Sequence, residues 1–324
     1  MTRTGFALLA SCSKLAVMGA GGMTATRRSM RGGSWIGALC LGVPDRGGDG
    51  GPADRSKFSK HMFTQPPLLT LLCLMRYEDW TFREVEVRLA EHAALRKALS
   101  LQQVPDYTTV SRFLRQLDDA TLQRVLTAVV RRLPRRRGKT VLAIDGTGLT
   151  PGAVGTFFVK RLHDQGGTWR RWCKWLIAVD VPRRALLAQR ARQGPTNDSV
   201  TLRPVAADAS AVVPVGAVVA DAECDRERNH RFIRDTLGAK SAIPATQGKP
   251  TWRIHGIRAQ MRRHFSRALY RQRTLVESVI AAAKRKLSDR APGRSPRTQH
   301  LQALVLSLAY DVYRLKCRCH RVVV

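Results

Sequence analysis

Two short apolar segments that each run into an aspartate constrain the fold of this chain more than any other feature. Residues 141–144 (VLAI) lead into Asp145, and residues 217–220 (AVVA) lead into Asp221. Such runs predict buried strands that each deliver a carboxylate to a carboxyl end. Two acids on neighbouring strands repel each other unless a cation lies between them. The pair therefore predicts an α/β domain with an acidic site, although either aspartate alone is also explained as the cap of a turn.

A third acid lies in YRQRTLVESVIAAAK, residues 270–284. In one continuous helix, Tyr270, Arg273, Glu277 and Lys284 would share a stripe about 60° wide, beside the apolar face. An ordinary ion-paired surface explains such a stripe equally well. Together with the two aspartates, however, Glu277 completes a set of oxygen ligands suited to Mg²⁺ or Mn²⁺. Two such ions assist in-line displacement at a phosphodiester.

The chain divides into three parts by composition and periodicity. Residues 1–62 are basic and glycine-rich and are expected to be disordered. Residues 63–134 predict an all-α unit, with one helix starting at Thr108 or Thr109 and another at Asp118 or Asp119. Residues 135–324 alternate strands and helices, so the fold class is an α/β domain with a mixed sheet flanked by helices, preceded by an all-α region. Strands are expected at 140–147, 155–161, 172–180, 184–192, 216–224 and 241–245, and helices at 199–210, 226–237, 270–284 and 298–316.

The charge of the chain points to a polyanion as partner. Lys and Arg number 56 against 24 Asp and Glu, which gives a formal net charge of +32. A solvated basic surface or tail is the alternative, but the charge extends through segments that look folded. One of these, residues 111–117 (SRFLRQL), could enter a DNA groove in helix-turn-helix fashion, although plain helix packing explains it as well.

Cysteine usage and hydropathy limit the setting. The seven cysteines form no CxxC pair, which favours a reducing, intracellular compartment. Cys317, Cys319 and His320 lack the second half of a zinc motif. No apolar run is long enough for a membrane helix, so no membrane partner is expected.

Taken together, these motifs resemble the insertion-sequence transposases of the DDE superfamily, in the branch with a Tyr-Arg-Glu-Lys helix. The pattern Y-x2-R-x3-E-x6-K is met by residues 270–284, D-G-T by residues 145–147, and A-D by residues 220–221. Residues 194–199 (GPTNDS) are similar to the family's G-P-x-H-D-S, with Asn197 where histidine is usual.

The resemblance implies an RNase H-like catalytic domain over residues 135–324 and a helical DNA-binding region over residues 63–134. It implies two divalent ions held by Asp145, Asp221 and Glu277, strand cleavage at terminal inverted repeats, and strand transfer into target DNA. It further implies that Tyr270, Arg273 and Lys284 hold the transposon end. A homodimer on double-stranded DNA, in the bacterial cytoplasm and associated with the nucleoid, is the expected assembly.

Two residues depart from the family pattern. Glu223 and Cys224 stand where the family has glycine and tyrosine after the second acid. A catalytically inactive, transposase-derived DNA-binding protein is therefore the alternative.

Overall fold

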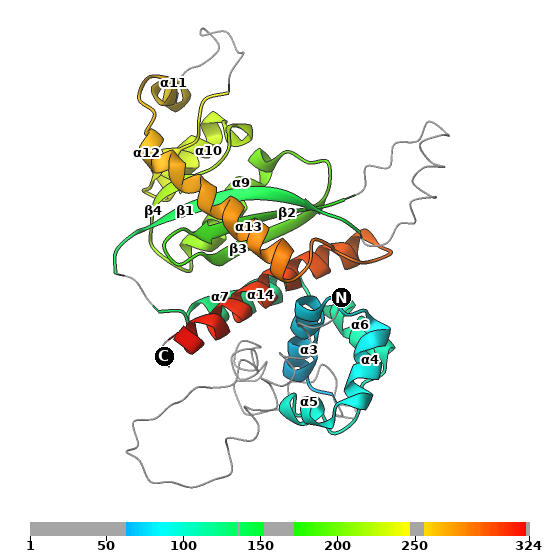
Figure 1. The fold of residues 1–324 in the computed structure, drawn as a ribbon. Coiled ribbons are helices and arrows are strands. Elements are labelled where there is room, and N and C mark those ends of the chain that lie inside the picture. Colours follow the sequence, from blue (N-terminus) through cyan, green and yellow to red (C-terminus); the bar gives the residue numbers. More distant parts are fainter. Residues whose placement is uncertain (1–62, 135–136, 152–171, 247–255, 322–324) are drawn as a thin grey trace, which may run out of the picture.

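A mixed sheet covered by helices forms the larger part of the molecule, and a group of helices precedes it in the chain (Figure 1). The computed structural model describes residues 63–134, 137–151, 172–246 and 256–321, with side chains up to residue 315. The predicted N-terminal extension, the predicted strand at 155–161 and the side chains of Cys317, Cys319 and His320 lie outside the described residues. The predicted fold class, a mixed sheet flanked by helices after an all-α region, is confirmed.

Polar side chains cap three helices of the first group. The group consists of α3 (Gln65–Glu78), α4 (Phe82–Glu91), α5 (Ala93–Ala98), α6 (Tyr107–Gln116) and α7 (Asp119–Val130), of which α4, α6 and α7 are the capped helices. Asp118 caps α7 through the amide of Thr121, as the sequence predicts. The predicted start of α6 at Thr108 or Thr109 is slightly late, because Asp106 accepts from the amide of Thr108 and caps the helix earlier.

Within the described residues the sheet has five strands in the order β3-β2-β1-β4-β5. Strands β1, β2 and β3 pair antiparallel, whereas β1, β4 and β5 pair parallel. Strand β1 is therefore central, and Ala143 on β1 lies opposite Val219 on β4. The bounds are β1 (Thr140–Leu149), β2 (Cys173–Asp180), β3 (Ala185–Gln193), β4 (Val215–Val219) and β5 (Lys240–Ala242).

Both acid-bearing strands differ in length from their predictions. Strand β1 does not end near Asp145 but continues to Leu149, because its second half still pairs with β2. Strand β4 ends at Val219, and the 3₁₀ turn η1 (Ala222–Cys224) replaces the predicted end of that strand. The two acids thus lie within one strand and just beyond the other.

The remaining helices surround the sheet and include one correction. Residues 270–284 are not one continuous α-helix: Tyr270 ends α12, and a 3₁₀ turn at residues 271–273 precedes α13. The tighter turn coincides with the contact that Arg273 makes to strand β1. The elements are α9 (Asp198–Ser210), α10 (Glu227–Arg231), the π-turn η2 (Phe232–Thr236), α11 (Gly256–Arg263), α12 (Arg267–Tyr270), η4 (Arg271–Arg273), α13 (Thr274–Lys286) and α14 (Pro296–Arg321).

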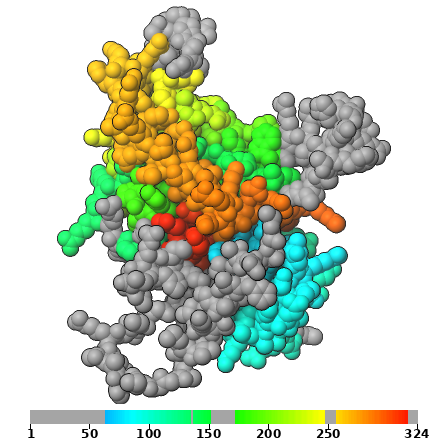
Figure 2. Space-filling view, in the orientation of Figure 1, coloured from blue at the N-terminus to red at the C-terminus, as the bar shows by residue number. Residues whose placement is uncertain are grey.

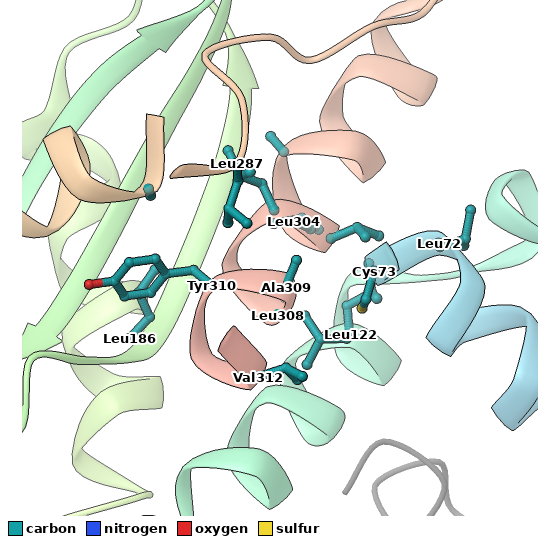
Figure 3. Packing of buried hydrophobic residues seen from close by; sticks show 14 of the residues in the cluster. Leu72, Cys73, Leu122, Leu186, Leu287, Leu304, Leu308, Ala309, Tyr310 and Val312 are labelled. Carbon is teal, nitrogen blue, oxygen red and sulfur yellow. The ribbon is translucent and has the colours of Figure 1, made fainter. Parts of the chain in front are cut away.

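The long helix α14 packs between the sheet and the first group of helices (Figures 1 and 3). Its buried residues Leu304 and Leu308 belong to one core with Leu72 of α3, Leu122 of α7 and Leu186 of β3. A second core lies on the other face of the sheet, beneath α9. One core therefore joins the helices to the sheet across residues 134 and 135. Among the helices of the described residues, none has an apolar stretch that could span a lipid bilayer.

Candidate catalytic site

Asp145 and Asp221 come from neighbouring parallel strands. Ala143 and Val219 are partners across β1 and β4, so the two acids, each two residues further on, reach the same end of the paired strands. The side chain of Asp145 is 18% exposed, whereas Asp221 is exposed. One oxygen of each accepts from the next amide, Gly146 at 3.0 Å and Ala222 at 2.7 Å. Asp221 therefore caps the turn η1, whereas Asp145 lies inside strand β1, and each aspartate keeps its second oxygen for other partners.

Arg273 connects the first acid with the acid of helix α13. One terminal nitrogen of its guanidinium lies 2.7 Å from Glu277, and the other lies 3.5 Å from Asp145. Glu277 is about half exposed. The helical stripe predicted from the sequence thus faces Asp145, and its arginine lies between two carboxylates.

The electrostatics of this group centre on Asp145. Burial raises its pKa to about 6, against the opposing effects of the Gly146 amide and Arg273, while Glu277 and Asp221 raise it further. The site therefore concentrates negative charge around Asp145, and Arg273 offsets part of it.

Lys284 and Tyr270, the other residues of the stripe, take different positions. The Lys284 amine donates to Thr147 Oγ1 at 2.7 Å and to the carbonyl of Gly148 at 2.9 Å, and burial lowers its pKa. It therefore links α13 to strand β1 just beyond Asp145. The Tyr270 ring lies 5.7 Å from the Arg273 guanidinium carbon, at the approach to the site.

The donor set suits a divalent cation by its chemistry, since carboxylate oxygens are what Mg²⁺ prefers. Among the described residues, however, no three acidic, histidine or cysteine side chains are close enough to hold a metal ion. The guanidinium of Arg273 lies between Asp145 and Glu277 and contacts both carboxylates.

A second group, unnoticed in the sequence, adjoins the aspartates. The Lys174 amine on β2 lies 2.9 Å from Asp198 and 3.7 Å from Glu223. Glu223 also accepts from the amide of Asp198, at the start of α9, which Asn197 caps. No local sequence pattern predicts this contact, because the two partners of Lys174 lie 24 and 49 residues away in the chain.

Asp145, Asp221 and the second group line a common cavity of about 580 Å³, whose lining does not include Arg273 or Glu277. Asp145 and Asp221 contribute to its wall together with Trp172, Lys174 and Asp198. Burial raises the pKa of Asp198, an effect that Lys174 opposes and that Glu223 and Asp221 reinforce. The cavity is therefore polar and acidic, with Lys174 on its rim.

The fold and the site define a class of protein. A mixed sheet with the first acid on its central strand, the second after the neighbouring parallel strand and the third on a flanking helix is an RNase H-like domain. Residues 136–312 match the family model described as "Transposase DDE domain", which covers more than half of the chain. The chain belongs to this family of DDE transposases. No curated protein matches it.

Proposed function

We propose that this transposase cleaves DNA at the terminal inverted repeats of its element and joins the freed ends to target DNA. The observation that carries the proposal is the meeting of Asp145 and Asp221 on adjacent parallel strands, with Glu277 joined to Asp145 through Arg273. Family membership supports polynucleotidyl transfer, and the acids supply the chemistry for it.

In the proposed reaction, water attacks the phosphorus at the element end and the 3′-oxygen leaves as a hydroxyl. That hydroxyl then attacks a target phosphodiester, displacing the target's own 3′-oxygen, so one bond forms for each bond broken. We propose that Asp145, Asp221 and Glu277 hold two Mg²⁺ or Mn²⁺ ions, which when bound stabilise the attacking and leaving oxygens. For Glu277 to join the aspartates, the Arg273 guanidinium has to move from between the carboxylates.

DNA-end binding is assigned to the other residues of the helical stripe. We propose that Tyr270, Arg273 and Lys284 contact transposon-end phosphates, as in the Tyr-Arg-Glu-Lys branch. An arginine fork and an ammonium are both good phosphate partners. The proposal includes a helical DNA-binding region at residues 63–134, a catalytic domain at residues 135–324, and a homodimer on DNA in the bacterial nucleoid.

An inactive copy is the alternative function, and the surroundings of Glu223 and Cys224 argue against it. Lys174 lies near the carboxylate of Glu223, so the acid that replaces glycine has a counter-charge. Cys224 is buried in the core beneath α9, away from solvent. Neither residue takes the place of one of the three acids.

The test uses purified protein, a labelled inverted-repeat duplex, Mg²⁺ or Mn²⁺ and a target plasmid. We expect nicking and strand transfer with the wild-type protein and neither with Asp145→Asn, Asp221→Asn or Glu277→Gln, while each variant still binds the duplex. Binding by the wild type without nicking supports the inactive alternative. Cleavage that survives Glu277→Gln would refute the assignment of the third acid.

A further inference from the structure

We propose that residues 256–271 form a basic arm that grips the phosphate backbone of duplex DNA beside the cavity, and that buried Asp225 anchors this arm. The inference rests on the proposed function in taking DNA as the partner. It assigns a second DNA contact and a positioning role to residues outside the stripe of helix α13.

The arm carries unopposed positive charge. Arg262, Arg263, Arg267 and Arg271 are all exposed, and no Asp or Glu occurs between positions 256 and 276. Among the described residues none of these four arginines has an ion-pair partner. Figure 2 shows this segment, in gold, at the surface at one end of the molecule. Four solvated arginines on one short segment are the expected composition of a phosphate contact.

Asp225 anchors the arm through a buried contact with helix α11. Its side chain is fully buried and accepts from Arg258 of α11 through two nitrogens, at 3.0 and 2.6 Å. It also accepts from the Thr246 amide at 2.9 Å and lies 3.2 Å from His230 Nε2. Burial raises the pKa of Asp225, but hydrogen bonds from His230, Arg258 and Thr246 together hold it well below its usual range. A buried pair of this kind is strongly disrupted when one partner is removed.

Two further contacts set the direction of α11. Glu227 accepts from the amides of Ile257 and Arg258 at 3.2 and 3.3 Å, and so satisfies the free start of the helix. Gly256 has a φ of +61°, and a Cβ there would lie 2.4 Å from the Glu227 carboxylate. A larger residue at position 256 is therefore strained at this φ and displaces the Glu227 carboxylate from its capping position.

The arm is tied to the catalytic site at both ends. At one end its anchor, Asp225, follows Asp221 by four residues, on the same loop. At the other end the Phe265 ring packs against Tyr270 at 5.2 Å, and Tyr270 in turn lies against Arg273. DNA held by the arm is therefore held next to the proposed DNA-end residues.

Phosphate contacts have a measurable signature in salt. Each neutralised phosphate adds about 0.9 to the slope of log K against log salt. The variant Arg262→Gln/Arg263→Gln removes two exposed charges without touching the core. Its affinity for DNA is expected to be lower than that of the wild type. The ratio of the wild-type affinity to the variant affinity is expected to shrink about 12-fold between 50 and 200 mM salt, because the variant makes two fewer phosphate contacts.

The anchor gives a sharper test, because Asp225→Asn makes the protein more positive by one unit. Electrostatics alone predicts tighter DNA binding, whereas loss of the anchor predicts weaker binding and faster amide exchange in α11. Arg258→Lys keeps the charge but loses the two-nitrogen contact, and is expected to weaken binding as well. Arg184→Gln, an exposed arginine in the turn between β2 and β3, is the matched control.

The experiment measures fluorescence anisotropy with an element-end duplex and a scrambled duplex across that salt range. We expect Arg262→Gln/Arg263→Gln and Asp225→Asn to weaken binding to both duplexes equally. Arg184→Gln is expected to leave binding to both duplexes unchanged. Unchanged binding by the double arginine variant overturns the arm, and unchanged or tighter binding by Asp225→Asn overturns the anchor. A loss confined to the element-end duplex overturns phosphate recognition.

The two proposals fail in different ways. If the wild type binds and cleaves DNA and the arm variants bind DNA as tightly as the wild type, the proposal of the basic arm is wrong and the proposed function stands. If the wild type binds neither duplex, both fail. Because Arg262 and Arg263 are exposed, their variant decides the outcome even if Asp225→Asn does not fold.

Discussion

Arg273 and Glu277, one helical turn apart at the start of α13, are joined by a contact of 2.7 Å. The same guanidinium reaches 3.5 Å from Asp145 on the central strand. Arg273, the basic residue of this contact, thus joins two acids that are 132 residues apart in the chain.

Replacing Arg273 is expected to lower the rate of catalysis without unfolding the protein. Arg273→Gln removes the guanidinium that is proposed to contact the transposon-end phosphate, and a preorganised donor at a developing charge is worth about 100-fold in rate. We expect a nicking rate lower by about that factor on a labelled element end. Arg273→Lys is not expected to restore it, because an ammonium cannot make the two-nitrogen contact with a phosphate that a planar guanidinium makes. Arg285→Gln, an exposed change on the same helix, serves as the control. A rate within threefold of the wild type in Arg273→Gln would contradict the proposed role of Arg273 at the DNA end.

The second group allows a double-mutant cycle. Lys174 and Asp198 are 17% and 12% exposed at 2.9 Å, whereas Glu223 is 40% exposed at 3.7 Å from the same amine. Exposed pairs contribute only about 0.2–1 kcal/mol. We therefore expect the coupling of Lys174→Met with Asp198→Asn in urea unfolding to exceed its coupling with Glu223→Gln. Equal couplings would mean that Glu223 interacts with Lys174 as strongly as the buried partner does.

Stability is expected to depend on pH through Asp311 of α14. Its side chain is fully buried, one oxygen accepts from the Leu186 amide at 3.1 Å, and the other has no partner among the described residues. Burial raises its pKa to about 8. The folded protein then holds a proton that the unfolded chain releases near pH 4. This proton's contribution to stability is present below pH 4 and is lost as pH rises toward 8.

Unfolding in urea at several pH values tests this sign. We expect the unfolding free energy to fall between pH 5 and 8 in the wild type and to lose that component in Asp311→Asn. Asp289→Asn changes an exposed acid and is expected to keep the wild-type slope. Parallel slopes in the wild type and Asp311→Asn would contradict the expectation.

The shared core predicts joint unfolding of the helices and the sheet. Leu72 of α3 is 2% exposed and belongs to the core that includes α14. Leu72→Ala is expected to cost about 2–5 kcal/mol and to lower one common transition. Coincident far-ultraviolet circular dichroism and tryptophan fluorescence would report this, since Trp175 lies in the same core. Val87→Ala, at a position 54% exposed, should have little effect. Two separate transitions would mean that the helical part unfolds independently of the sheet.

Local chemistry made much of this molecule predictable from its sequence. Apolar runs before Asp145 and Asp221 predict strands because burial of β-branched side chains is a local pattern. Asp118 predicts the start of α7 because a cap acts within one turn. The length of β1 and the break at residues 271–273 were mispredicted because both depend on partners, strand β2 and Asp145, that are distant in the chain.

The family, the charge and the two acid-bearing strands could be predicted from the sequence alone. The ion pairs could not: Arg273 lies between Asp145 and Glu277, Lys174 joins Asp198 near Glu223, and Asp225 is buried against Arg258 only because the fold brings these residues together. Strand and helix periodicity act over a few residues, whereas ion pairs in a folded site form between whichever charges the packing of distant elements brings within hydrogen-bond reach.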